Sequence, residues 1–252
     1  MSNVIAESAG IAKDIKLGNF CVIGANVSID AGCIIGNGVI IHPDTQIGSN
    51  VRIDDNTVLG KLPMKAANSA VTKDQQLPAL TIGDNCIIGT SVVIYRGCKI
   101  GEKVLVADLS SVRENVSIGN FTIIGRGVAV ENFCEVGCYC KLETNVYLTA
   151  YSKVEDRVFI APCVATSNDN FVGRTEERFK HFKGVTVKKG GRIGVGAVIL
   201  PGKELGADCL IAAGALVAAN APAKTIVAGI PAKKFREVPD EQLLENQNWE
   251  KK

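Results

Sequence analysis

The chain has 252 residues with 28 basic and 26 acidic side chains, and this near balance of charge gives no electrostatic reason to expect nucleic acid as a partner. No basic and then apolar leader opens the sequence and no apolar run reaches about 18 residues, so we expect a cytoplasmic protein with no membrane partner. Glycine is abundant, at 26 residues, whereas aromatic residues make up only 5%, which favours a fold with a narrow interior.

From the N-terminus onward, an aliphatic residue occupies every sixth position, beginning at Ile5. A strand repeats every two residues and an α-helix every 3.6, so a period of six fits neither. The period fits a β-solenoid, in which each short strand points one aliphatic residue inward and three strands close a coil of about 18 residues. The Gly, Asn and Asp residues that often follow tolerate the positive φ of a tight corner.

The period is interrupted twice along the chain. Residues 61–80 and 167–184 are polar and show no sixfold pattern, so we expect each to protrude as a loop. The sixfold positions fall into three runs, which cover Ile5–Leu59, Ile82–Thr166 and Val187–Val217, and all of them except Thr166 are aliphatic. Together these runs predict an all-β parallel helix of about ten coils with two protruding loops.

The C-terminal residues depart from the repeat. After AGIPAKKF at residues 228–235, Pro239 and Asp240 begin a polar segment that predicts a short terminal helix with Asp240 as its cap. Such a helix would cover the sheet edge that the last coil leaves unpaired. We therefore expect a β-helix domain over residues 1–236 and a helical tail over residues 237–252.

The count of hexads predicts that both loops leave from one corner of the solenoid. Every third hexad shares a face, and Leu59 and Thr166 fall on the same face, five coils or about 24 Å apart. Between the loops this corner carries polar and aromatic residues where the other corners often carry Gly. One interpretation is a solvated edge with ion pairs such as Arg113 with Glu131. We favour a polar binding strip walled by the two loops.

Most of the nine cysteines follow the repeat. Seven lie two residues before an inward aliphatic residue, in a slot that elsewhere holds Val or Thr. They are interpreted as small core thiols in a reducing compartment, and neither as disulfides nor as metal ligands. Cys138 and Cys163 lie outside this register. The seven are Cys21, Cys33, Cys86, Cys98, Cys134, Cys140 and Cys209.

The repeats and the last coils resemble the hexapeptide-repeat acyltransferases. The matching motifs are the [Ile/Val/Leu]-Gly-x4 repeats, IGVGAVILPGKELG at 193–206, CLIAAGALVAANAP at 209–222 and the terminal VAGIPAKKF. The resemblance implies a left-handed parallel β-helix and a homotrimer whose active sites lie between subunits. It also implies an acyl-CoA donor, for which we expect acetyl-CoA.

Within that family, EDRVFIAPCVATSNDN at residues 155–170 and the loop after it look like N-acetyltransferases of amino sugars linked to a nucleotide diphosphate. The nearest resemblance is to the 3-N-acetyltransferases of dTDP-3-amino-3,6-dideoxyhexoses, which serve cell-surface polysaccharides such as the lipopolysaccharide O-antigen. It implies that Asn168 orients the sugar and that Asp169 holds the amine. Ala150 stands where many relatives carry a glutamate, so a carboxylate acts at this place only if Glu131 or Glu143 substitutes for it.

The expected binding residues form two groups. For the nucleotide sugar we expect side chains of the corner and of the second loop, since Arg can bind a diphosphate and an aromatic ring can stack on a base. These are Tyr95, Arg113, Glu131, Glu143, Tyr151, Arg174, Glu177, Arg178, Phe179 and His181. For coenzyme A the resemblance implies the C-terminal coils, with small residues that allow close approach and cations for the phosphates. These are Lys188, Lys189, Gly194, Ala212, Gly214, Lys224, Pro231, Lys234 and Arg236.

The chain has only two histidines, His42 and His181, although many relatives use a histidine base. His42 lies several coils from Asn168, and His181 lies in the second loop. The leading hypothesis is catalysis without histidine, in which the departing thiolate takes the proton.

Three other functions are alternatives to the acetylation of a nucleotide-linked amino sugar. A zinc hydratase with the same fold would need three histidines per metal, so we expect no metal. A scaffold would need flat faces, which two long loops interrupt. The alternative within the acyltransferases is a non-nucleotide amine as acceptor, or a longer acyl-CoA as donor.

Overall fold

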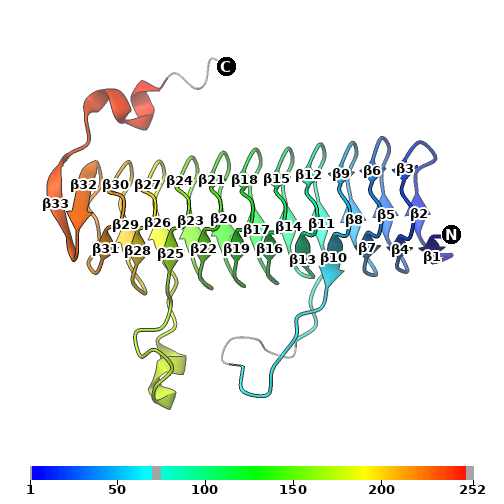
Figure 1. The fold of residues 1–252 in the computed structure, drawn as a ribbon, viewed down its shortest axis with the longest axis horizontal. Coiled ribbons are helices and arrows are strands. Elements are labelled where there is room, and N and C mark those ends of the chain that lie inside the picture. Colours follow the sequence, from blue (N-terminus) through cyan, green and yellow to red (C-terminus); the bar gives the residue numbers. More distant parts are fainter. Residues whose placement is uncertain (1, 70–74, 248–252) are drawn as a thin grey trace.

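The computed structural model describes residues 2–69 and 75–247, which form a long rod with the N-terminus at one end and the C-terminal segment at the other (Figure 1). The rod is a parallel β-solenoid of about 12 turns, with slightly more turns than the sequence indicates. Most strands are two residues long and lie in three sheets that run the length of the rod. We call these sheets A, B and C, and the corners between them AB, BC and CA in the direction of the chain.

The strands of each sheet stack in the order of the coils. Sheet A contains β1 (Val4–Ile5), β4 (Val22–Ile23), β7 (Ile40–Ile41), β10 (Val58–Lys61), β13 (Val93–Tyr95), β16 (Ser111–Val112), β19 (Ala129–Val130), β22 (Tyr147–Leu148), β25 (Ala165–Thr166), β28 (Val198–Ile199) and β31 (Leu216–Val217). Sheet B contains β2 (Gly10–Ile11), β5 (Ser28–Ile29), β8 (Gln46–Ile47), β11 (Thr81–Ile82), β14 (Lys99–Ile100), β17 (Ser117–Ile118), β20 (Glu135–Val136), β23 (Lys153–Val154), β26 (Thr186–Val187) and β29 (Glu204–Leu205). Sheet C contains β3 (Lys16–Leu17), β6 (Ile34–Ile35), β9 (Arg52–Ile53), β12 (Ile87–Ile88), β15 (Leu105–Val106), β18 (Ile123–Ile124), β21 (Lys141–Leu142), β24 (Phe159–Ile160), β27 (Arg192–Ile193), β30 (Leu210–Ile211), β32 (Thr225–Gly229) and β33 (Ala232–Glu237).

The interior of the rod is a single hydrophobic core built from the sixfold positions. The second residue of most strands is the aliphatic one, and it is buried, as in Leu142 and Leu148. The slot two residues earlier is also buried, and the seven cysteines predicted to fill it do so. Burial raises the thiol pKa of Cys98 and of Cys134 to about 12, so both are protonated at neutral pH. The interpretation of these seven cysteines as core thiols is confirmed.

Both loops leave the rod from sheet A at the AB corner, as the hexad count predicts. The first follows β10, and the second follows β25 and contains the short 3-10 helix η1 (Glu176–Lys180). Five steps of sheet A separate β10 from β25. Figure 1 shows the two loops extending from the same side of the rod.

The predicted C-terminal helix is wrong. After β32 the chain turns back in β33, which pairs antiparallel with β32 and covers the edge of sheet C. Between β33 and residue 247, where the described part of the chain ends, the helical elements are two 3-10 turns, η2 (Asp240–Gln242) and η3 (Leu244–Asn246). Leu243 separates them in an extended conformation, because its side chain is buried against Ile226 and Val238. The expected boundary between residues 236 and 237 falls inside β33.

No helix in the described ranges is both long enough and apolar enough to cross a membrane.

Replacing an inward residue should destabilise the rod, whereas replacing its outward neighbour should not. Leu142→Ala should lower the free energy of unfolding by about 2–5 kcal/mol, because it leaves a cavity in the close-packed core. The exposed neighbour Lys141 provides the control, and Lys141→Ala should change that energy by less than about 0.5 kcal/mol. Urea denaturation followed by circular dichroism measures both, and equal effects would contradict the assigned register.

Candidate functional site

A pocket of about 200 Å³ opens at the AB corner beside the second loop. Sheet A supplies its floor through residues in β22 or directly after β19, β22 and β25, and the loop supplies its wall. The lining residues are Glu131, Tyr147, Thr149, Ala150, Asn168, Asp169, Arg178 and Phe182. The pocket thus brings together Asn168 and Asp169 with Glu131 and Arg178, all of which the sequence marks as candidates.

Two hydrogen bonds of the buried Thr166 hold the backbone beneath the pocket. Thr166 takes a position that is aliphatic elsewhere, and its hydroxyl accepts a hydrogen bond from the Thr149 backbone N–H at 2.8 Å. The same hydroxyl donates to the Tyr147 carbonyl at 3.0 Å. Because a buried polar group is costly unless it is hydrogen-bonded, these two bonds fix the backbone on either side of Leu148.

The carboxylate of Glu131 faces an arginine that is already paired. Arg113 binds Glu114 through Nε at 2.8 Å and Nη2 at 3.1 Å, and Glu114 is almost completely buried. The Arg113 Nη1 lies 3.5 Å from a Glu131 carboxylate oxygen, so the ion pair that the sequence suggested is present. Burial raises the pKa of Glu131, with Arg113 opposing this shift and Glu114 adding to it.

The carboxylate of Asp169 organises the second loop. It accepts hydrogen bonds from the backbone N–H groups of Phe171 at 2.8 Å and Gly173 at 3.0 Å, and from Arg178 Nη1 at 3.1 Å. Burial acts to raise the pKa of Asp169, but the two backbone donors and Arg178 together hold it below its usual range. Asp169 is therefore a well-stabilised anion at the mouth of the pocket.

Of the second-loop candidates, only Arg178 lines the pocket together with Asn168 and Asp169. Its guanidinium lies over the ring of Phe182 at 5.5 Å and over that of Phe179 at 5.0 Å. Glu177 instead binds Lys180 and His181, at 2.9 and 3.1 Å. Phe179 and His181 are exposed, and Arg174 is too; none of the three is among the residues that line the pocket.

Four candidates of the rod lie outside the pocket lining, and Arg113 is one of them. Tyr95 is buried and packs against the Arg113 guanidinium, whose carbon lies 5.1 Å from the ring centre. Tyr151 stacks on Phe133 at the AB corner. Glu143 follows β21 and so lies at the CA corner, where the structure does not bring it to the other candidates. Ala150 does line the pocket, which leaves Glu131 as the corner carboxylate at this site.

Sequence reasoning missed two lining residues, Tyr147 and Phe182. Tyr147 is the outward residue of β22. Neighbouring residues of a strand point to opposite faces, so the inward position of Leu148 predicts Tyr147 on the surface of sheet A. Phe182 lies in the loop, where no period indicates its direction.

The candidate coenzyme residues do not converge in one chain. Gly194, Ala212 and Gly214 lie at the CA corner, after β27 and β30. Lys188 and Lys189 lie at the BC corner, after β26. The remaining candidates lie in or near the terminal hairpin of β32 and β33, and three of them form ion pairs or hydrogen bonds with glutamates. Lys224 pairs with Glu245 at 3.0 Å, Lys234 pairs with Glu237, Arg236 contacts the Glu237 carbonyl, and Pro231 lies in the hairpin turn.

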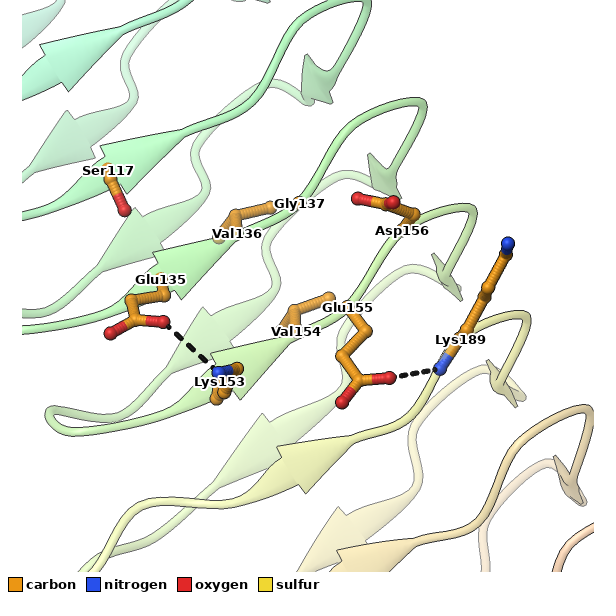
Figure 2. A pocket seen from close by; sticks show the side chains of 9 residues that line it. All are labelled: Ser117, Glu135, Val136, Gly137, Lys153, Val154, Glu155, Asp156 and Lys189. Atoms are coloured by element: carbon orange, nitrogen blue, oxygen red, sulfur yellow. Dashed lines mark hydrogen bonds and ion pairs between the residues drawn. The ribbon is translucent and has the colours of Figure 1, made fainter.

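A larger cavity of about 420 Å³ lies over sheet B and the BC corner (Figure 2). Lysines and carboxylates alternate along it: Lys153 lies 3.5 Å from Glu135, and Glu155 accepts a hydrogen bond from the Lys189 backbone N–H at 3.0 Å. Glu155 also pairs with Lys188 at 3.2 Å. The positive charges of this cavity are thus largely balanced by its own carboxylates.

His42 lines a separate cavity of about 280 Å³ under the first loop. Arg96 anchors that loop by donating to the carbonyls of Leu77 and Pro43, at 3.0 and 2.8 Å, and by pairing with Asp44 at 2.8 Å. Burial lowers the pKa of His42, and the nearby Lys61 and Arg96 lower it further. Six steps of sheet A separate β7, which precedes His42, from β25, which precedes Asn168.

Removing the Asp169 carboxylate should loosen the second loop without disturbing the rod. In Asp169→Ala the backbone N–H groups of Phe171 and Gly173 lose their acceptor, so their hydrogen exchange should accelerate about tenfold or more. Exchange at β22 should not change. Glu176→Ala, an exposed change in the same loop, is the control, and unaltered loop exchange in Asp169→Ala would contradict this role.

Comparisons with known proteins agree with the fold. A family model described as the hexapeptide repeat of succinyl-transferase matches residues 7–31, 79–107 and 185–219. A UDP-N-acetylglucosamine O-acyltransferase from Moraxella catarrhalis superposes with a TM-score of 0.58 at 20% identity, covering 93% of this chain and 72% of that chain. At that identity the likeness concerns the fold alone.

Curated relatives match over shorter segments. A 2,3,4,5-tetrahydropyridine-2,6-dicarboxylate N-acetyltransferase from Enterococcus faecalis is 46% identical over 48 residues, which are 19% of this chain and 21% of that protein. A serine acetyltransferase from Buchnera aphidicola is 39% identical over 67 residues, which are 27% of this chain and 24% of that protein. The chain thus spans less than a quarter of the length of these relatives. With the repeat pattern and the solenoid, these matches show that parts of the chain are similar to hexapeptide-repeat acyltransferases.

Proposed function

We propose that the chain is an acetyl-CoA-dependent N-acetyltransferase whose acceptor is the amino group of a nucleotide-diphosphate-linked amino-deoxy sugar. The observation that carries this proposal is the AB-corner pocket, which combines the Asn168 amide with the carboxylates of Asp169 and Glu131. An amino sugar arrives as an ammonium ion with hydroxyl groups around it. Two carboxylates complement the ammonium, and an amide can both donate to and accept from the hydroxyls.

The position of Arg178 supports a phosphorylated acceptor. Its guanidinium lies at the edge of the pocket, paired with Asp169 and stacked over the rings of Phe179 and Phe182. A guanidinium can bind two phosphate oxygens at once, and an exposed aromatic ring such as that of Phe179 can stack on a base. In this proposal the sugar enters the pocket, and the nucleotide lies across the outer surface of the second loop.

The separation of the two candidate sites supports a homotrimer with active sites between subunits. Gly194, Ala212 and Gly214 lie at the CA corner, whereas the acceptor pocket lies at the AB corner of the same rod. A pantetheine arm bound along the CA corner of one subunit can deliver its thioester to the AB-corner pocket of a neighbour. Cyclic symmetry then completes three equivalent sites.

A second candidate acceptor is a small amine without a nucleotide. The pocket volume of about 200 Å³ favours this alternative, because such a space holds little more than one sugar ring or an amino-acid-sized molecule.

An acceptor panel with acetyl-CoA tests the proposal. Thymidine- and uridine-diphosphate amino sugars should release free thiol, and free amino sugars and amino acids should release far less. Asp169→Asn should lower turnover at least tenfold, because it removes the charge that faces the ammonium and binds Arg178. Glu176→Gln, an exposed change in the same loop, is the matched control, and size-exclusion chromatography checks assembly.

Three outcomes would contradict parts of the proposal. Full activity of Asp169→Asn would overturn the role of that residue. Turnover of small amines alone would favour the second candidate acceptor. The absence of a thermal shift with saturating acetyl-CoA would contradict the choice of donor, since a ligand at 100 times its Kd stabilises by about 2.7 kcal/mol.

A further inference from the structure

We infer that Glu131 is the catalytic residue that takes the proton from the acceptor amine. The inference rests on the proposed function, because it concerns the same pocket and an amine acceptor. It assigns the base to a side chain of the rod, directly after β19, and leaves Asp169 to hold the loop and the ammonium.

The hydrogen bonds of Asp169 argue against that residue as the base. Its two carboxylate oxygens already accept from the N–H groups of Phe171 and Gly173 and from Arg178, at 2.8 to 3.1 Å. Protonating the carboxylate would weaken all three interactions, which is why its pKa is held below the usual range. Asp169 can attract an ammonium, but it binds a proton poorly near neutral pH.

The surroundings of Glu131 have the opposite effect. The arginine that it faces is bound at two points by Glu114, at 2.8 and 3.1 Å, and reaches Glu131 only at 3.5 Å. The charge of Arg113 is therefore shared, and the buried Glu114 repels a second negative charge. Next to Glu131, the side chain of Asn132 is buried, and neither of its amide atoms has a hydrogen-bond partner among the described residues. Poor solvation of this corner favours the protonated form of Glu131.

The charged and titratable groups around Glu131 come from three elements. Arg113 and Glu114 follow β16, Tyr147 lies in β22, and Asp169 and Arg178 belong to the second loop. Burial and the charge of Glu131 raise the pKa of Tyr147, so its hydroxyl stays neutral and cannot compete as an anionic base. A base works best when its pKa lies near the working pH, and Glu131 is the pocket carboxylate shifted in that direction.

The reaction balances with this assignment. The ammonium of the acceptor gives one proton to the Glu131 carboxylate and becomes a neutral amine. The amine nitrogen attacks the thioester carbonyl carbon, the new C–N bond forms and the C–S bond breaks. The departing thiolate takes the second N–H proton and leaves as the free thiol. Glu131 then releases its proton to solvent, and the net products are an amide, a thiol and one proton.

Glu131→Gln tests the assignment, because the amide has the same shape but cannot accept the proton. We expect kcat/KM at neutral pH to fall about 100-fold, with the KM for acetyl-CoA unchanged. The pH profile should also move. In the wild type, activity falls as pH drops through the raised pKa of Glu131. In the variant the amine must lose its proton to solvent first, so the deficit should shrink at alkaline pH.

Glu102→Gln, an exposed change at the BC corner, is the control for the loss of one negative charge. Two results would overturn the assignment while leaving the proposed function intact. One is a Glu131→Gln variant with wild-type kcat/KM, and the other is a deficit of the same size at every pH, which indicates a structural role. A wild-type protein that acetylates no amine would instead contradict the proposed function, and this inference with it.

Discussion

The structure depends on one packing constraint, which is that a single aliphatic side chain from each two-residue strand must fill a narrow triangular interior. Leu142 and Leu148 are fully buried in successive strands, and their partners one coil away lie directly in register. Because the interior admits no change of spacing, each coil places its corners above those of the previous coil. A one-residue slip would turn this aliphatic set outward, so the register is strongly specified.

The same register creates the candidate site. Corner residues one coil apart stack, which brings Glu131 and Thr149 together at the AB corner. The second loop begins at this corner and adds Asp169 and Arg178, whose side chains form an ion pair with each other. The rod thus supplies a rigid carboxylate and the loop supplies groups whose positions depend on its own hydrogen bonds. Rigid placement suits a proton acceptor, and an adjustable loop suits the recognition of a substrate.

The sequence predicts much of this arrangement, because a strict period turns residue numbers into positions. It predicts the solenoid, the inward cysteines and the common corner of both loops. The pairing of Arg113 with Glu131 belongs to the less favoured interpretation of that corner, as a solvated edge, and the structure shows that pair. Prediction from the sequence fails where the sixfold period ends. Buried Leu243 prevents the expected terminal helix through a tertiary contact with Ile226 and Val238, and the direction of Phe182 depends on the loop. The candidate coenzyme residues share no corner with the pocket, so they lie apart from it within one chain.

The central claim is that the acceptor amine binds at the AB-corner pocket between Glu131 and Asp169. A crystal structure with coenzyme A and a nucleotide-linked amino sugar tests it most directly. The account predicts the amine nitrogen within hydrogen-bonding distance of the Glu131 carboxylate, with the Asn168 amide on the sugar and the sulfur reaching the pocket from a neighbouring subunit. An amino sugar bound in the cavity near His42, or over sheet B near Lys189, would contradict the account.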